Sequence, residues 1–494
     1  MNAFVPEPER KWTVGTAPSI FPAITHGIAL FRRPLQFLNS LPAHGDLVEI
    51  RLGPLRAWVV CHPDLVHEML RDTRTFDKGG TQYDRLRLLM GDSVVTCPHA
   101  QHRRQRRLVQ PAFRPSQVAE HTRLMLDEAE LVCREWRAGQ EVDVSAAMSA
   151  MTTRVISRVL FSDSLDATTA AEVRHCLTDV VRGLFLRTVV PVDAVFRIPT
   201  PANRRYQHAI ARLHTIIAGV IDERRRAPDA PRDDLLETLL EAARGDGDAV
   251  PTVGEQEIHD QLITLLLTGV ETTALCLASA FGLLARNPDS EERLHAEIDT
   301  VLAGRPRLTP EDLPRLVQTR AVITETLRHS PPGWLFTRVT TRDTKLAGQR
   351  LPKGSMVLYS PYLLHHDPAS FPDPGRFLPG RWLPAQEPAG SRTALIPFAA
   401  GSRKCLGDTF AVTEAIAAVA VIASRWRLRH PAGPVERQRP VVTLGPRSLV
   451  MICEPRARRT TDAPTRGDAP ALRAGVALRV PDSRTAGDNG VDDA

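Results

Sequence analysis

The spacing of apolar positions along the chain predicts mostly helices. Apolar residues recur every three to four positions in HPDLVHEMLRD (62–72), in residues 101–108 and in TRLMLDEAELVCREW (122–136), as in amphipathic helices. A longer apolar stretch runs from Val253 to Arg286, where Asn287-Pro288 stops it. This stretch is about three times as long as a mean globular helix. We therefore expect it to cross the whole molecule.

Short runs with β character interrupt the helices. DLVEIRLGPLRAWVV (46–60) has two β-rich runs around Gly53-Pro54, the pattern of a hairpin, and similar pieces return in TKLAGQRLPKGSMVLYSP (344–361). The Pro-rich stretch HHDPASFPDPGRFLPGRWLP (365–384) has no clear period, but its aromatic residues favour an ordered, packed loop. The pattern predicts a mainly α protein with small β-sheets.

The two ends of the chain differ from the body. Residues 1–30 form an entry segment, and SIFPAITHGIALF (19–31) is interpreted as a packed amphipathic segment, with contact to a surface as the alternative. No N-terminal apolar run reaches the ~18 residues of a membrane span, and no signal-peptide layout is present. The body covers 31–453. Residues 454–494 are short of aromatics and rich in Arg, Asp, Thr, Pro and Gly, so a disordered tail is expected.

Composition changes this picture little. With 43% hydrophobic and 24% charged residues among 494, the chain has the make-up of a soluble globular protein. The 63 Lys and Arg exceed the 57 Asp and Glu by only six charges, which does not indicate nucleic acid but allows a local basic face for an acidic protein. Seven cysteines without a CxxC pair argue against a disulfide framework, so a location in a reducing cytoplasm is expected.

The candidate chemistry lies in PFAAGSRKCLGDTFA (397–411), which sets Cys405 between two glycines beside two cations. Three interpretations compete: a buried structural thiol, a catalytic nucleophile, or a single thiolate ligand to a metal. A lone thiolate cannot complete a tetrahedral zinc site, and no other Cys or His lies within a few residues. Haem supplies four nitrogens of its own and needs only one axial protein ligand. The spacing therefore favours a haem thiolate.

The neighbours of Cys405 have the properties that such a site needs. Gly401 allows a tight turn, Arg403 offers a cation to the haem propionates, and Gly407 lets the next helix begin close to the porphyrin. Phe398 is placed to cover the sulfur. The positive end of the following helix favours the thiolate over the thiol.

This array matches every fixed position of FxxGxRxCxG and so resembles the haem-binding signature of the cytochrome P-450 family. The resemblance covers about residues 30 to 453. It implies the P-450 fold, a mainly helical triangular prism with a small β-rich lobe near the N-terminus. It also implies haem b, iron protoporphyrin IX, with the Cys405 thiolate as axial ligand to the iron.

A second motif, TGVETT (268–273), lies near the middle of the long predicted helix. It looks like the oxygen-activating motif of the family, which implies that Glu271 and Thr272 form an acid-alcohol pair that delivers protons. Gly269 would thin the helix where it faces haem. Thr268 departs from the family, which more often has Ala or Gly there. The alternative is a Thr-rich buried helix with one charge on its outer face.

A third motif, ETLR, places Glu325 and Arg328 three residues apart on one helix face. In the family an arginine from the Pro-rich loop completes a buried structural triad. The stretch PGRF (374–377) offers Arg376 for that role, although Gly375 replaces the usual acidic residue.

Further residues resemble the propionate-binding set of the family. HAQHRRQRRLVQPAF (99–113) places His102 and Arg106 one helical turn apart. Arg338, in PPGWLFTRVTT, matches another propionate arginine. We interpret Arg103 and Arg104 as a solvated face.

The resemblance also implies the reaction. The chain has neither GxGxxG nor GxxxxGKS/T, so electrons must come from a partner, most simply a ferredoxin with its NADPH-dependent reductase, docking near Arg403 and Lys404. Family geometry places residues 76–96, residues 180–196 and Trp334 to Phe336 around the distal face of the haem, where the substrate would bind. These segments are largely apolar, so an apolar substrate held by shape is expected.

Within the family, LFRRPLQFLNSLPAHGDLVEIRLGPLRAWVVCHPDLVHEML (30–70) and FAAGSRKCLGDTFA (398–411) look like the bacterial sesquiterpene oxidases of the pentalenene oxygenase type. That implies oxidation of a methyl group on a tricyclic hydrocarbon, through alcohol to aldehyde, in terpenoid antibiotic biosynthesis. The alternatives are a peroxide-driven haem-thiolate enzyme and a non-catalytic haem sensor. The pair Glu271 and Thr272 argues against both.

Overall fold

Helices make up most of the computed structural model, which describes residues 11–19, 21–162, 164–189, 193–226, 232, 234–244, 253–384, 391–432 and 440–456. The helices are α1 (Pro22–Arg32), α2 (Pro34–Ser40), α3 (Pro63–Arg71), α4 (Thr81–Met90), α5 (His99–Val109), α6 (Pro115–Glu135), α7 (Val144–Phe161), α8 (Ala167–Val189), α9 (Asp193–Arg197), α10 (Pro201–Arg226), α11 (Leu235–Arg244), α12 (Glu255–Leu284), α13 (Pro288–Leu302), α14 (Val317–His329), α15 (Pro361–His365), α16 (Ser391–Ala394) and α17 (Asp408–Arg425).

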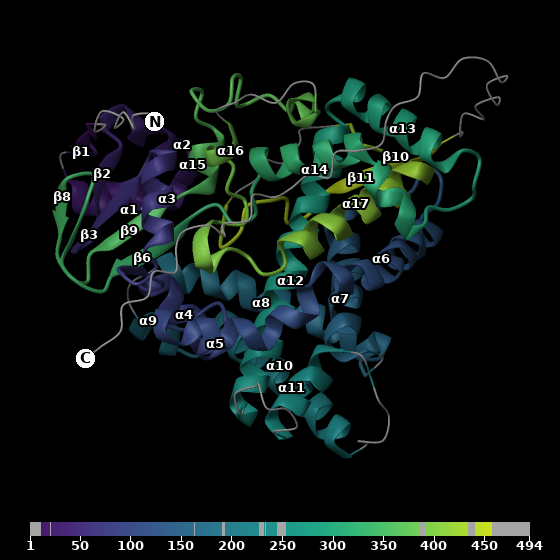
Figure 1. Ribbon diagram of the computed structural model, residues 1–494, viewed down its shortest axis with the longest axis horizontal. Helices are drawn as coiled ribbons and strands as arrows, with labels where there is room; N and C mark the ends of the chain where they lie inside the picture. Colours follow the sequence, from purple (N-terminus) through teal and green to yellow (C-terminus); the bar gives the residue numbers. More distant parts are fainter. Residues whose placement is uncertain are drawn as a thin grey trace, which may run out of the picture.

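Most strands form a lobe at one end, where the small β7-β8 sheet also packs, and the β10-β11-β5 sheet lies elsewhere (Figure 1). Their bounds are β1 (Val14–Thr16), β2 (Leu47–Leu52), β3 (Leu55–Val60), β4 (Phe76–Asp77), β5 (Glu141–Asp143), β6 (Phe336–Thr340), β7 (Thr344–Leu346), β8 (Gln349–Leu351), β9 (Met356–Tyr359), β10 (Trp426–Arg429) and β11 (Val450–Pro455). The largest sheet has the order β1-β2-β3-β9-β6-β4. In Figure 1 the outline is roughly triangular, with this sheet, α13 and the α10–α11 pair toward the corners.

The predicted hairpin is confirmed. Strands β2 and β3 pair antiparallel with Leu47 opposite Val60 and Leu52 opposite Leu55, so Gly53-Pro54 forms the turn. Gly53 has φ +62°, a backbone conformation that glycine adopts without steric cost. Strand β9, which follows the Pro352–Ser355 turn almost 300 residues later in the sequence, adds to β3 in parallel. The N-terminal lobe therefore takes strands from distant parts of the chain.

Helix α12 is the predicted long central helix, and it begins and ends within two residues of the expected bounds. Its side chains are buried almost without interruption from Asp260 to Leu284, because α7 and α17 pack against it. It is the one described helix long and apolar enough to span a bilayer, but 78% of its apolar window is buried inside the fold. The apolar surface of α12 therefore packs against the surrounding helices.

The C-terminal boundary lies close to where the composition changes. Strand β11 ends at Pro455, and Arg456 donates a hydrogen bond of 2.8 Å to Asp299 on α13. The tail expected to be disordered falls, from residue 457 on, outside the residues that the structure describes.

Candidate active site

The loop before α17 presents Cys405 on its outer side. The Cys405 N–H donates to the Phe398 carbonyl at 2.9 Å, and the Lys404 N–H donates to the Gly401 carbonyl at 3.0 Å, so the loop is closed by its own backbone. Cys405 itself is exposed. Ala399 has φ +58°, an uncommon conformation for a residue with a side chain, of the kind that clusters at functional sites. The loop holds a strained shape that leaves the thiol accessible.

Gly401 is required by this loop. Its φ is +70°, and a Cβ there would lie 2.3 Å from the Leu70 carbonyl oxygen at the end of α3. Because a backbone atom cannot move aside, only glycine permits this approach. Gly407 is different: a Cβ there would meet only the Phe113 ring at 3.9 Å. No protein atom therefore requires glycine at position 407. Glycine there is expected if a bound cofactor, rather than the protein, lies against this turn.

The two glycines lead to a paired prediction. Gly401→Ala should lower the stability of the apoprotein by more than about 1–2 kcal/mol, because it combines the left-handed conformation with a backbone clash. Gly407→Ala should leave the apoprotein melting temperature nearly unchanged but weaken haem uptake. Thermal unfolding of the apoproteins and haem titration measure these effects. Equal stability of the two variants would contradict the steric account.

The following helix favours the thiolate less than the sequence suggested. Helix α17 begins at Asp408, so Cys405 lies three residues before it. Although the Cys405 residue has exposed surface, the protein atoms packed around its sulfur partly exclude water and raise the pKa of the thiol, and the Gly407 N–H and the Arg106 charge only partly offset this rise. A coordinating metal ion deprotonates a thiol outright. The ionisation of Cys405 would therefore come from a bound metal rather than from the helix.

Arg403, which the sequence predicts as a cation for the haem propionates, points into the protein. Its side chain is 1% exposed and donates to the Cys97 carbonyl at 3.0 Å and to an Asp77 carboxylate oxygen at 2.8 Å. The remaining donor, Nε, is buried and has no hydrogen-bond partner among the described residues. An unpaired buried donor is costly, so this position fits an additional acceptor such as a carboxylate.

Arg338 on β6 has the same property. Its two terminal nitrogens donate to the hydroxyls of Tyr83 at 3.2 Å and Tyr359 at 3.3 Å, while its buried Nε lacks a partner within the described part of the chain. The two tyrosines hold the guanidinium without neutralising it. Arg338 is therefore a second buried cation whose Nε–H group can donate to a further acceptor.

The two predicted α5 residues differ in role. His102 is buried, and burial together with Arg403 and Lys78 lowers its pKa to about 3, so it is neutral at physiological pH and offers an N–H rather than a charge. Arg106 donates to the Lys404 carbonyl at 2.7 Å and to the Ser402 carbonyl at 3.3 Å. Arg106 therefore fastens α5 to the cysteine loop.

Lys78 is a functional candidate that the sequence analysis missed. Burial, with the charges of Arg338 and Arg403, lowers its pKa to about 7. Its Nζ donates to the Val95 carbonyl at 2.8 Å and lies 5.6 Å from the centre of the Tyr83 ring. The only local sign of a special role was its position before a Gly-Gly pair, in FDKGG. The neighbouring sequence does not show that Lys78 lies near two arginines from distant segments.

These groups fit the haem expected from the family resemblance. Cations gather from three distant segments, Lys78 after β4, Arg338 on β6 and Arg403 beside Cys405, and two of them have an unused buried donor. Propionate carboxylates are suitable acceptors for such donors. The arrangement combines one accessible thiol with an anion-binding cluster. The residues that would hold haem are therefore present.

On α12, the TGVETT motif coincides with a gap in burial. Between Asp260 and Leu284 every residue is buried except Thr268, Gly269, Glu271 and Thr272, which are half-buried. The Thr272 hydroxyl donates to the Thr268 carbonyl at 2.8 Å, and the Thr268 hydroxyl donates to the Thr264 carbonyl at 2.7 Å. Both threonine hydroxyls therefore bond to a carbonyl of the preceding turn, as threonines within helices often do.

Glu271 makes its polar contacts with a loop and not with Thr272. Its carboxylate accepts a hydrogen bond of 2.7 Å from Thr443 and lies 3.2 Å from an Arg447 nitrogen, both in the loop before β11. No side-chain hydrogen bond joins Glu271 and Thr272 in the described part of the chain. Burial raises the pKa of Glu271, and Arg447 and Thr443 partly offset it. Thr443 and Arg447 gave no signal in the sequence.

Gly269 lies where α12 packs against α7. A Cβ at Gly269 would lie 3.1 and 3.2 Å from side-chain carbons of Ile156 on α7. The glycine therefore allows α12 and α7 to approach closely, and its predicted place beside the haem stays a prediction.

The buried triad uses a different arginine from the one expected. Arg328 and Glu325 form two hydrogen bonds, of 2.8 and 2.9 Å, and both side chains are fully buried. Arg376 is 70% exposed and approaches Asp373 instead. Arg381 lies 3.4 Å from Glu325, and the Trp382 indole donates to Glu325 at 2.8 Å. The chain contains PGR-aromatic twice, and the second copy completes the triad.

This correction predicts opposite outcomes for two similar substitutions. Arg381→Ala removes a buried charged partner of Glu325 and should destabilise the protein by about 1.5–3 kcal/mol. Arg376→Ala changes an exposed side chain and should stay within about 0.5 kcal/mol of wild type. Urea unfolding of both variants measures the difference. A larger loss from Arg376→Ala would restore the first assignment.

Two other expectations need revision. Arg104 is not part of a solvated face, because it forms a two-point ion pair with Glu257 that ties α5 to α12. Trp334 is 5% exposed, packs in the core beneath the β lobe and donates to the Val441 carbonyl at 2.9 Å. Leu335 and Phe336 are half-buried. Of the 180–196 segment, residues 190–192 lie outside the described residues.

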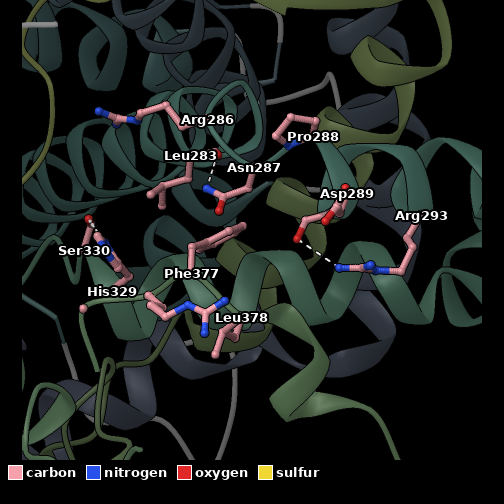
Figure 2. Close-up of a pocket in the computed structure, with 13 residues that line it drawn as sticks. Leu283, Arg286, Asn287, Pro288, Asp289, Arg293, His329, Ser330, Phe377 and Leu378 are labelled. Carbon is pink, nitrogen blue, oxygen red and sulfur yellow. Dashed lines mark hydrogen bonds between the residues drawn. The ribbon is translucent and has the colours of Figure 1, made fainter. Parts of the chain in front are cut away.

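A separate pocket of about 760 Å³ lies between the end of α12, the start of α13, the end of α14 and the Pro-rich loop. Figure 2 shows Phe377 among its lining residues, with Arg286 and Arg293 on different sides. None of the residues assigned to the haem or to proton delivery lines it. This pocket belongs to the triad region rather than to the candidate active site.

Comparison with known proteins identifies the family and the fold. The sequence pattern of the family described as "Cytochrome P450" matches residues 18–452. A solved structure titled "Crystal structure of cytochrome P450DA heme domain" superposes with a TM-score of 0.80 at 24% identity, covering 91% of this chain and all of that chain. At that identity the likeness establishes the fold, which confirms the predicted fold class.

Three curated relatives share more of the sequence. A cyclooctat-9-en-7-ol 5-monooxygenase and a cyclooctatin synthase, both from Streptomyces melanosporofaciens, are 49% and 47% identical, over 91% and 90% of this chain and 97% of each relative. A pentalenene oxygenase from Streptomyces avermitilis is 43% identical over 85% of this chain and 92% of its own length. All three match nearly from end to end.

Proposed function

Because the chain belongs to the cytochrome P-450 family of haem-thiolate monooxygenases, we propose that it oxidises a compact polycyclic terpene. The single observation that carries this proposal is the identity of 43–49% to relatives named for pentalenene, cyclooctat-9-en-7-ol and cyclooctatin. Bound haem supplies the activation of O2. In the overall reaction one oxygen atom enters a C–H bond of the substrate and the other leaves as water, with two electrons and two protons consumed.

The proposal assigns each part of the site a task. Cys405 would provide the thiolate ligand of the haem iron, and the Phe398–Gly401 loop would hold that sulfur in place. Lys78, Arg338 and Arg403 bind the propionates, with Arg106 fixing the cysteine loop and His102 contributing a neutral N–H. Support comes from the two unpartnered Nε donors and from the convergence of these cations.

Proton delivery is assigned to Thr272, supplied through Glu271. The Thr272 hydroxyl already has a resting acceptor in the Thr268 carbonyl, from which it can rotate toward a bound ligand. Glu271 is held by Arg447 and Thr443. Its pKa is raised toward the pH of the reaction, and a carboxyl whose pKa lies near that pH can both take up and release a proton. Because no side-chain hydrogen bond joins Glu271 and Thr272 among the described residues, the proposal requires either a rotation of Glu271 or a bridging water.

For electron supply we propose a ferredoxin with its NADPH-dependent reductase, in a reducing cytoplasm. Arg103 and Arg107 are exposed on α5, and Lys404, 48% exposed, adjoins Cys405. The hydrogen bonds from Arg106 place α5 against the cysteine loop. These cations form a basic face near the thiolate, which suits an acidic electron carrier.

The finer substrate proposal is methyl oxidation of a tricyclic sesquiterpene, through alcohol to aldehyde, as the sequence resemblance to pentalenene oxygenases implies. A second candidate is oxygenation of a cyclic terpene alcohol, because two relatives with higher identity are named for cyclooctat-9-en-7-ol and cyclooctatin. Both substrates are apolar ring systems that a pocket would select by shape.

Purified full-length protein, with ferredoxin, reductase and NADPH, should convert at least one of pentalenene and cyclooctat-9-en-7-ol. A linear fatty acid of similar carbon number is the control and should give little product. Product analysis by gas chromatography and mass spectrometry distinguishes alcohol from aldehyde. Conversion of the fatty acid alone would overturn the terpene proposal while leaving the family unchanged.

A further inference from the structure

The pocket beside the buried triad is lined by more positive than negative side chains. Its volume of about 760 Å³ lies within the usual range for sites that bind small molecules. Three arginines line it, Arg286, Arg293 and Arg376, while Asp289 is the one carboxylate among the lining residues that the structure describes. Uncharged polar side chains form much of the remaining wall. The pocket therefore suits a polar, anionic ligand better than an apolar one.

The three arginines come from three different elements. Arg286 follows the last turn of α12, Arg293 is on α13, and Arg376 is in the Pro-rich loop. Figure 2 shows Arg286 and Arg293 on different sides of the pocket. A ligand with more than one anionic group can contact arginines on both sides, whereas a small ion with one such group contacts one side at a time.

Two of these arginines have no carboxylate partner in the described part of the chain. Arg286 donates to a carbonyl of α12 at 3.1 Å, and Arg293 donates to the Ser290 hydroxyl at 3.3 Å. Arg376 lies 3.8 Å from an Asp373 oxygen, but both side chains are about 70% exposed, so this pair is weak. Although Arg286 has exposed surface, protein atoms partly exclude water from its guanidinium and lower its pKa. A bound anion would supply the missing opposite charge.

The Pro-rich side of the pocket is fixed by the buried triad. Arg328 donates to the carbonyls of Pro374 at 2.8 Å and Arg376 at 3.0 Å. The Leu378 N–H donates to the Glu325 carboxylate at 2.9 Å. Because the side chains of Glu325 and Arg328 are fully buried, they hold the backbone of this wall in place without a ligand. A preformed wall lowers the entropy cost of binding.

We propose that this pocket binds a small molecule that carries two or more phosphate groups, such as an organic diphosphate. The guanidinium groups bind phosphate oxygens through charge-assisted hydrogen bonds, a contact for which the planar arginine side chain is well suited. The bound molecule joins the end of α12, the start of α13 and the Pro-rich loop, and so stabilises the fold around the triad. The site is separate from the haem site, and the proposal does not rest on the terpene assignment.

Isothermal titration of the full-length haem protein with pyrophosphate tests the proposal. At constant ionic strength set with sodium chloride, pyrophosphate should bind about tenfold more tightly than orthophosphate, because the longer ion contacts more than one arginine. Arg286→Gln and Arg293→Gln should each weaken pyrophosphate binding about tenfold. Pyrophosphate at about ten times its dissociation constant should raise the melting temperature of wild type by about 1–3 °C, and that of the double variant by less.

Arg134→Gln on α6 and Arg103→Gln on α5 are matched controls, since both arginines are exposed on other elements. Both variants should bind pyrophosphate like wild type. Without ligand, all of these variants should melt close to wild type, because each changes an exposed side chain. An equal loss of affinity in Arg103→Gln would move the binding to the basic face of α5 and overturn the proposal. Absence of pyrophosphate binding at constant ionic strength, or equal affinity for orthophosphate, would also overturn it.

Discussion

Cys405→His is expected to abolish monooxygenase activity and the thiolate spectrum of the reduced carbon monoxide complex, while retaining part of the haem. Imidazole can ligate the iron, so some haem should remain, but it lacks the electron density that a thiolate supplies. The loss of activity should exceed the about 10–100-fold effect typical of residues that only orient a ligand. Absorbance of the reduced protein with and without carbon monoxide measures the axial ligand.

A matched thiol serves as control for this variant. Cys61 is half-buried in the β lobe, where burial raises its pKa to about 12, and it packs at the edge of the core cluster there. Cys61→Ala should therefore keep the wild-type spectrum and turnover. An unchanged thiolate spectrum in Cys405→His, or its loss in Cys61→Ala, would refute the assignment of the ligand.

Thr272→Ala is expected to uncouple electron transfer from product formation. The substitution removes the hydroxyl but changes no charge and only a small side-chain volume. Substrate and haem should therefore still bind. NADPH consumption should continue, while hydrogen peroxide replaces product and the yield per NADPH falls on the order of 100-fold, the scale of general acid catalysis. Parallel assays of NADPH, peroxide and product measure the coupling.

Thr268→Ala is the control, one helical turn earlier. Its hydroxyl makes the same kind of bond to a preceding carbonyl, and the side chain is also half-buried. Because the resembled family more often has Ala or Gly at this position, Thr268→Ala should remain coupled. Wild-type coupling in Thr272→Ala would move proton delivery to other groups, such as water held near Glu271.

Local sequence predicted those features that depend on neighbouring residues. The hairpin at 46–60, the long helix α12 and the turn at Gly401 follow from periodicity, helix stop signals and glycine placement. The cysteine loop was recognised because all its groups lie within ten residues. Such features need no knowledge of the rest of the chain.

Features that depend on distant contacts could not be predicted in this way. Two PGR-aromatic copies are equivalent as sequences, and only the packing around Glu325 selects Arg381 over Arg376. Glu271 turns toward Arg447, and Gly269 faces Ile156, because α12 meets a loop and a helix that its own sequence does not specify.

Oxygen isotope labelling tests the central claim, that the chain is a haem-thiolate monooxygenase driven by external electrons. Full-length protein turns over its terpene under ¹⁸O2 with ferredoxin, reductase and NADPH, and mass spectrometry reads the label in the first alcohol product. The account predicts one ¹⁸O atom in each new hydroxyl group and dependence on NADPH. Oxygen drawn from water, or equally fast product formation from peroxide without ferredoxin, would contradict it.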